Sequence, residues 1–79
     1  MRLNIISPER ILFSGNVISV TLPGEVGSFT ILDNHAPIIS SLQKGILSYK
    51  CYAEDDEIEL SIEGGFVEGK ENKVNVCID

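Results

Sequence analysis

Short runs of alternating apolar and polar residues, separated by turn-forming residues, are the feature that most constrains the fold of this 79-residue chain. Glu57–Glu63 is the clearest run, because Ile58, Leu60 and Ile62 alternate with glutamate and serine. In an extended strand this alternation places the apolar side chains on one face and the polar ones on the other. Lys73–Asp79 repeats the pattern. No window has the 3.6-residue apolar period of a helix, so no long helix is expected.

Three further segments have the composition of strands. Arg2–Ser7 mostly alternates between polar and apolar residues. In Asn16–Leu22, the residues at 18, 20 and 22 are expected on one face of the strand and those at 17, 19 and 21 on the other. Gly45–Tyr52 carries apolar groups on both faces, and a short apolar run occupies Ile11–Phe13. Turns are predicted at 7–9, 14–16, 23–24, 53–56, 64–65 and 69–72.

This spacing of turns, at intervals of about eight to twelve residues, is typical of an antiparallel β-sandwich or barrel. We therefore expect an all-β fold, a flattened antiparallel β-sandwich or barrel of about eight to ten short strands. Residues 1–79 are expected to form a single domain, because a chain of this length falls below the size at which chains divide. Such a domain buries only ~60–65% of its unfolded surface, so its core is thin.

The net charge argues against several classes of partner. The chain has 12 acidic and 6 basic residues and a formal net charge of -6. Nucleic acids and anionic lipids attract basic surfaces, so binding to DNA, RNA or a lipid surface is not expected. No apolar run reaches the ~18–20 residues that a membrane helix needs, so direct lipid insertion is not expected either.

His35 is the only histidine and the first candidate for catalysis. Asp33 lies two residues before it and Ser40 five residues after it, but a catalytic histidine needs a nucleophile and an orienting group in space, not only in sequence. Loops favour aspartate and serine for turn formation alone. The pattern favours a structural or interface role for His35, and no catalytic residue is predicted.

Metal and cofactor sites are not predicted. Cys51, Cys77 and His35 lack the close spacing of metal ligands. The glycines at 24, 27 and 45 lack the helix that follows a phosphate-binding loop, and the acidic residues 54–57 lack the alternating ligands of a calcium loop. Both thiols are expected to be reduced, since no signal peptide precedes the strand-like start. A disulfide between them stays open at this stage.

The segment Leu22–Gly45 is the part of the chain that indicates a family. The matching segments, in chain order, are Ile6-Ser7-Pro8-Glu9, Phe13-Ser14-Gly15, Pro23-Gly24-Glu25-Val26-Gly27, Ile31-Leu32, His35-Ala36-Pro37-Ile38-Ile39, Leu42, Gly45 and Ile62-Glu63-Gly64-Gly65-Phe66-Val67-Glu68. With these segments the chain resembles the epsilon subunit of F-type rotary ATP synthases, specifically its N-terminal β-sandwich domain. The resemblance covers nearly all of the chain, and His-Ala-Pro is its most specific element.

The resemblance implies a non-catalytic subunit of the central stalk. Such a subunit turns with the rotor and couples the gamma subunit to the membrane c-ring, so that ion-driven rotation drives ATP synthesis. It implies a peripheral position on the cytoplasmic face of the bacterial inner membrane. Whether protons or sodium ions drive the ring stays open. The sequence departs from the family at Asp33, where a proline is common, and it stops before the C-terminal helical hairpin that is common in the family. If these 79 residues are the whole protein, inhibition and ATP binding by that hairpin are not expected. Whether such a segment was lost from a longer product stays open.

The resemblance also implies two partner-binding surfaces. The gamma-facing surface is expected to include Ser7, His35, Pro37 and Ser40. The loops that face the c-ring are expected to include Glu25, Val26, Gly27, Ser28, Asp33 and Asn34. Ring loops of the family usually carry arginine, which suits the carboxylates of Glu25 and Asp33.

Two alternatives come from other functional classes. A free-standing β-barrel that binds a small ligand or a protein would need an enclosed cavity for the ligand, which a domain of this size hardly provides. A small hydrolase built on His35 would need a convergent nucleophile and an oxyanion site. Binding to a rotary shaft separates the stalk hypothesis from both.

Overall fold

A computed structural model describes residues 1–52 and 56–79, and those residues form eight strands and no helix. The strands are β1 (Arg2–Ile6), β2 (Ile11–Gly24), β3 (Gly27–Leu32), β4 (Ile38–Leu42), β5 (Gly45–Cys51), β6 (Ile58–Ile62), β7 (Gly65–Lys70) and β8 (Lys73–Ile78). The predicted all-β class is confirmed. The acidic turn predicted at 53–56 lies largely outside the described residues. In the described part no helix is long and apolar enough to cross a bilayer.

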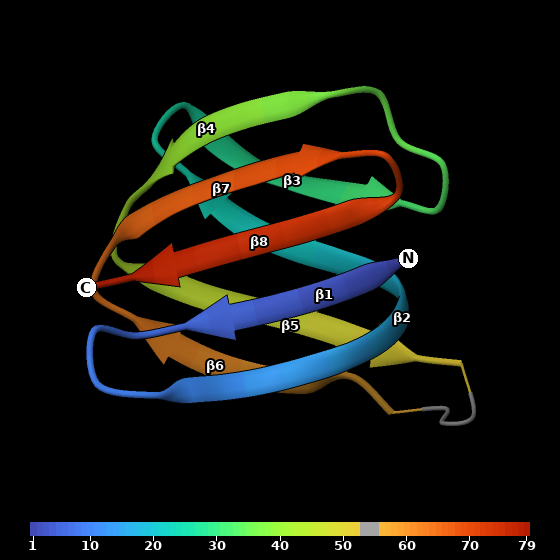
Figure 1. The fold of residues 1–79 in the computed structure, drawn as a ribbon. Helices are drawn as coiled ribbons and strands as arrows, with labels where there is room; N and C mark the ends of the chain where they lie inside the picture. Colours follow the sequence, from blue (N-terminus) through green and yellow to red (C-terminus); the bar gives the residue numbers. More distant parts are fainter. Residues whose placement is uncertain (53–55) are drawn as a thin grey trace.

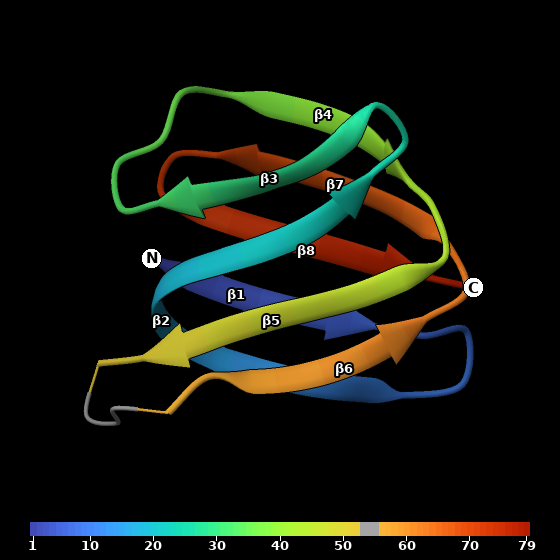
Figure 2. The same cartoon turned by 180° about the vertical axis from the view of Figure 1, so that it is seen from behind.

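The strands form two layers. One layer contains β4, β7, β8 and β1, which follow one another across the molecule in Figure 1. Figure 2, from behind, shows the other layer, formed by β3, β2, β5 and β6. We call these the front sheet and the back sheet. Strand pairs are antiparallel except β1–β8, which is parallel.

Strand β2 joins the two layers. Its first half pairs with β1 in the register Arg2↔Asn16, and its second half pairs with β3 and β5 in the back sheet. The turn predicted at 14–16 is therefore wrong, because these residues continue the strand. Gly15 lies where the ring of Phe13 folds back, and a Cβ there would be 3.0 Å from the ring's Cζ atom.

A bulge in β2 overturns the predicted assignment of its faces. The register against β5 shifts between Val17 and Ser19, so one extra residue of β2 enters the ladder. After a bulge of this kind, each residue points to the face opposite to the one that simple alternation predicts. Val17 and Val20, three positions apart, are for this reason both fully buried. The expectation that residue 17 shares a face with residues 19 and 21 is wrong.

The core lies between the two sheets and is apolar. Its buried members are Met1, Leu3, Ile5, Val17, Val20, Leu22, Ile31, Leu42, Leu47, Tyr49, Ile62, Val67, Val74 and Val76. The alternation predicted for β6 is confirmed at Ile62, which is 2% exposed. Ile58, at the other end of β6, is 40% exposed, because β6 pairs only with β5 and lies at the edge of the sheet.

Two turns with left-handed backbone geometry carry the chain into and out of β7. Gly64 and Gly65 lead from the back sheet to the front sheet with φ of 150° and 142°. A Cβ on Gly65 would lie 2.0 Å from the carbonyl oxygen of Cys77, so only glycine fits there. Glu71 and Asn72, with φ of 52° and 59°, form the two-residue hairpin between β7 and β8.

Candidate partner-binding surfaces

The outer face of the front sheet carries exposed apolar side chains. Because successive side chains point to opposite faces of a strand, burial of Val67 and Gly69 directs Phe66 and Glu68 outward from β7. Phe66 is 51% exposed, and Ile39 of the neighbouring strand β4 is 76% exposed. Neighbouring exposed apolar side chains are typical of contact surfaces, so these two residues mark a candidate contact surface.

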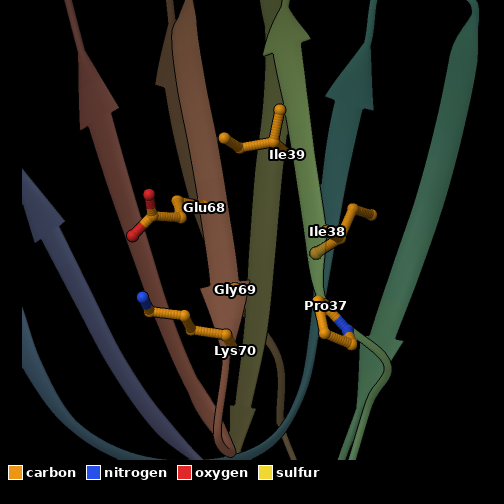
Figure 3. Close-up of a pocket in the computed structure, with 6 residues that line it drawn as sticks. All are labelled: Pro37, Ile38, Ile39, Glu68, Gly69 and Lys70. Atoms are coloured by element: carbon orange, nitrogen blue, oxygen red, sulfur yellow. The ribbon is translucent and has the colours of Figure 1, made fainter.

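Two grooves lie on this face. One, of about 300 Å³, is lined by Ile6, Ser7, Pro8, Phe66, Cys77, Ile78 and Asp79. The other, of about 270 Å³, lies between β4 and β7 and is lined by Pro37, Ile38, Ile39, Glu68, Gly69 and Lys70, as Figure 3 shows. Ser7 and Pro37, both predicted to face gamma, thus line grooves on the same sheet face. The neighbouring apolar residues at 6, 39 and 66 were not predicted as contacts.

Ser7 and Ser40 use their hydroxyl groups locally. The Ser7 hydroxyl accepts the backbone N–H of Arg10 at 3.2 Å and donates to the carbonyl of the same residue at 3.1 Å. These bonds fix the turn between β1 and β2. The Ser40 hydroxyl donates to the carbonyl of Ser41 at 3.1 Å, and Ser40 lies on the face of β4 opposite Ile39.

His35 packs against β7. Its Nδ1 atom lies 3.0 Å from the carbonyl oxygen of Ala36. Its Cε1 atom lies over Gly69, where a Cβ would come within 2.9 Å. The Nε2 atom is buried and has no hydrogen-bond partner among the described residues. The ring therefore fixes the connection between β3 and β4 against the front sheet and holds Pro37 at the surface.

The two loops predicted to face the c-ring lie at opposite ends of β3. Glu25 and Val26 form the turn before this strand, and Asp33 and Asn34 follow its last residue (Figure 1). Val26 is fully exposed at the tip. The N–H of Glu25 donates to the carbonyl of Ser41 at 3.2 Å, which holds the turn against β4. Gly27 and Ser28 begin β3 and are exposed.

Asp33 is exposed, and its carboxylate is bound by other groups of the same chain. Its carboxylate accepts hydrogen bonds from the Met1 amine and from the Tyr52 hydroxyl. The same amine donates to the carbonyl of Val17 at 3.0 Å. The hydrogen bond from the amine, followed by that from Tyr52, lowers the pKa of Asp33, and the bond to Asp33 raises the pKa of Tyr52. Asn34 is tied as well, because its N–H donates to Oδ1 of Asn72 at 2.8 Å.

The sequence matches a known family over its whole length. The family model of the β-sandwich domain of the ATP synthase delta/epsilon chain matches residues 1–79. The chain belongs to this family. Curated relatives include the ATP synthase epsilon chain of Leptospira interrogans (strain Fiocruz L1-130), 42% identical over 80 residues, which cover all of this chain and 61% of the relative. The epsilon chain of Carboxydothermus hydrogenoformans is 43% identical over 76 residues, or 96% of this chain and 55% of the relative.

Solved structures have the same fold. A chain of the Euglena gracilis mitochondrial ATP synthase, in a structure of OSCP, F1 and c-ring, superposes with a TM-score of 0.89 at 19% identity, covering 96% of this chain and 48% of that chain. A chain of the Tetrahymena thermophila mitochondrial ATP synthase, in a structure of the central stalk and c-ring, gives 0.84 at 15% identity, covering 98% and 61%. The present chain thus spans about half to three fifths of the proteins that it matches.

Cys51 and Cys77 are free thiols, and in the described part of the chain no three His, Cys, Asp or Glu side chains lie together as metal ligands. Cys77 lines a groove on the front sheet, whereas Cys51 packs against the core. Ile39 and Phe66 were not predicted as candidate contacts, although each is an apolar residue that is exposed between less exposed neighbours of its strand.

Proposed function

We propose that this chain is the β-sandwich part of a non-catalytic rotor subunit in the central stalk of an F-type ATP synthase. In this role it couples the gamma subunit to the c-ring of the membrane sector, so that ion-driven rotation reaches the catalytic head and drives ATP synthesis. It acts as a peripheral protein on the cytoplasmic face of the bacterial inner membrane. It binds its partners through outer surfaces and carries no cofactor, metal or ATP.

The observation that carries this proposal is the exposed apolar face of the front sheet. Ile6, Ile39 and Phe66 lie outward there, beside the two grooves. Side chains of this kind, set in pockets and surrounded by polar groups, contribute most of the binding energy of protein interfaces. We assign this face to gamma, with Ser7, His35, Pro37 and Ser40 at or beneath its edges.

The turn between β2 and β3 is the better candidate for the c-ring. Val26 is fully exposed at its tip, and Glu25 beside it is exposed and suits a basic loop. Gly27 and Ser28 extend the same surface. Asp33 and Asn34 lie at the other end of β3, about 20 Å from this turn, because the strand has six residues. They can reach the ring as well only if β3 lies along its surface.

Truncation of Phe66, with a matched control, tests the assignment of gamma. Phe66 is 51% exposed, so gamma would cover about 100 Å² of the roughly 200 Å² that a phenylalanine presents. At about 25 cal/mol per Å² this area corresponds to ~2.5 kcal/mol, or about 60-fold in Kd. Ile46, 50% exposed on the outer face of the back sheet, is the control.

Calorimetric titration of purified gamma from the same organism into wild type, Phe66→Ala and Ile46→Ala gives the answer. We expect Phe66→Ala to weaken binding at least tenfold and Ile46→Ala to change it less than twofold. A wild-type chain that does not bind gamma at micromolar concentration would refute the proposal. Equal losses of affinity in Phe66→Ala and Ile46→Ala would contradict the assignment of the interface to the front sheet.

A further inference from the structure

Three cations lie side by side on the outer face of the front sheet. Lys70 pairs with Lys73 across the β7–β8 hairpin, and Lys73 pairs with Arg2 of β1. All three side chains are exposed. We call these three residues the basic row. It collects half of the 6 basic residues of a chain whose net charge is -6.

The basic row is unfavourable in the isolated chain. Directly opposite residues of neighbouring strands have Cβ atoms about 5 Å apart, and like charges at that spacing repel each other. The ion pairs among the described residues, Met1–Asp33 and Lys44–Glu63, involve no member of the row. Arg2 donates to the Ser14 hydroxyl at 2.8 Å, which supplies no negative charge.

Two carboxylates lie near the row without forming an ion pair with it. Glu68 lies two residues before Lys70 on the same face of β7, as Figure 3 shows, and Glu71 lies in the hairpin turn. Neither carboxylate is paired with a member of the row. The row therefore presents positive charge to whatever covers this end of the sheet.

The opposite end of the same face is apolar. Phe66 pairs with Cys77, and Cys77 with Ile6, so the apolar groups form a parallel row of their own beside the 300 Å³ groove. Phe66 and Lys70 are four residues apart on β7, which corresponds to about 13 Å. The face thus changes from apolar to basic along the strand direction, with the hydrogen-bonded pair Asn4–Asn75 between the two ends.

We propose that the basic row binds carboxylates of an acidic segment of the gamma subunit. This segment also places an apolar side chain about 13 Å away, in the groove beside Phe66. The inference rests on the function proposed above, and charge complementarity carries it. Complementary charges at an interface raise the association rate and fix the orientation of the partner. Because one end of the face is apolar and the other is basic, the domain docks on the gamma subunit in one direction only.

Lys73→Glu is the informative variant, because it moves stability and binding in opposite directions. A glutamate between Lys70 and Arg2 replaces repulsion by attraction on both sides, so the isolated domain should melt about 2 °C higher. The same change should weaken binding to gamma about tenfold at low salt, and less at high salt. A folding defect does not produce this combination.

Lys50→Glu is the matched control. Lys50 is on the outer face of the back sheet, opposite Ser19, and both variants change the net charge from -6 to -8. Titration of gamma into wild type and both variants, at low and high salt, should show the tenfold loss only for Lys73→Glu. A parallel titration uses vesicles of anionic phospholipid.

The outcomes separate this inference from the proposed function. Failure of the wild-type chain to bind gamma refutes the proposed function itself. Tight wild-type binding with no loss for Lys73→Glu, or with equal losses for both variants, refutes the role of the basic row alone. Binding to anionic vesicles that Lys73→Glu abolishes, without any effect on gamma, would assign the row to lipid and overturn the inference.

Discussion

Substitution of Gly65 by alanine tests how tightly the fold joins its two sheets. This residue has a φ of 142° at the start of β7, and a Cβ there would lie 2.0 Å from the carbonyl oxygen of Cys77. Alanine at such a backbone angle costs ~1–3 kcal/mol in strain. The clash adds ~1–3 kcal/mol, because β7 or β8 must move.

Gly27 provides a control with a similar positive φ and no clash. Its φ is 134°, and no atom lies within 4 Å of the position of a Cβ. The effect of alanine on the entropy of the unfolded chain is common to both variants and cancels in their difference. Gly65→Ala should therefore be ~1–3 kcal/mol less stable than Gly27→Ala, out of a total of ~4–12 kcal/mol for a domain of this size.

Urea unfolding followed by circular dichroism measures this difference. In thermal unfolding the same difference corresponds to a melting temperature lower by about 4–8 °C for each kcal/mol. Free energies of unfolding that agree within about 0.5 kcal/mol for the two variants would contradict the reasoning. Such a result would mean that the approach of β7 to the carbonyl of Cys77 is not a constraint in the folded protein.

Three further predictions concern the core, the loss of stability at low pH and a turn. Leu47→Ala removes a fully buried side chain and should cost ~2–5 kcal/mol in urea unfolding, whereas Ile46→Ala, half exposed on the same strand, should cost less than ~1 kcal/mol. The lowered pKa of Asp33 means that its contribution to stability is present above the unfolded value of 3.8 and is lost as the pH falls through the lower folded value. In a plot of unfolding free energy against pH, Asp33→Asn should therefore lose less stability than wild type as the pH falls below about 4. Glu71→Asn should stabilise the domain by ~0.5 kcal/mol, because asparagine adopts positive φ more readily in a two-residue hairpin; an unchanged urea midpoint would count against this.

Local alternation predicted the strands that have one wet face. β6 and β8 follow the pattern of the sequence because each side chain faces either the core or the solvent. β2 does not, since it passes from one sheet to the other and a bulge at its middle reverses its parity. The parallel pairing of β1 with β8 joins the two ends of the chain, and no local pattern indicates such a contact.

The candidate surfaces were predictable only in part. The family segments indicated Ser7, Pro37 and the turn at Glu25–Ser28. Phe66 lies in a matching segment but was not predicted as a candidate contact, because its place on this face depends on the strand order β8-β7-β4. Nor could the sequence place the Met1 amine against Asp33, because that contact depends on how β1 and the end of β3 meet in the folded chain.

Protection of Cys77 by gamma is the most direct test of the central claim that the front sheet is the surface seated on the shaft. Cys77 lines the groove beside Phe66, so in a Cys51→Ser background it reports on this face alone. Thr30→Cys, in a background without both native cysteines, reports on the outer face of the back sheet, where Thr30 is exposed. Saturating gamma should slow maleimide labelling of Cys77 at least tenfold and leave labelling at position 30 unchanged. An unchanged rate at Cys77, or protection at position 30 only, would contradict the account.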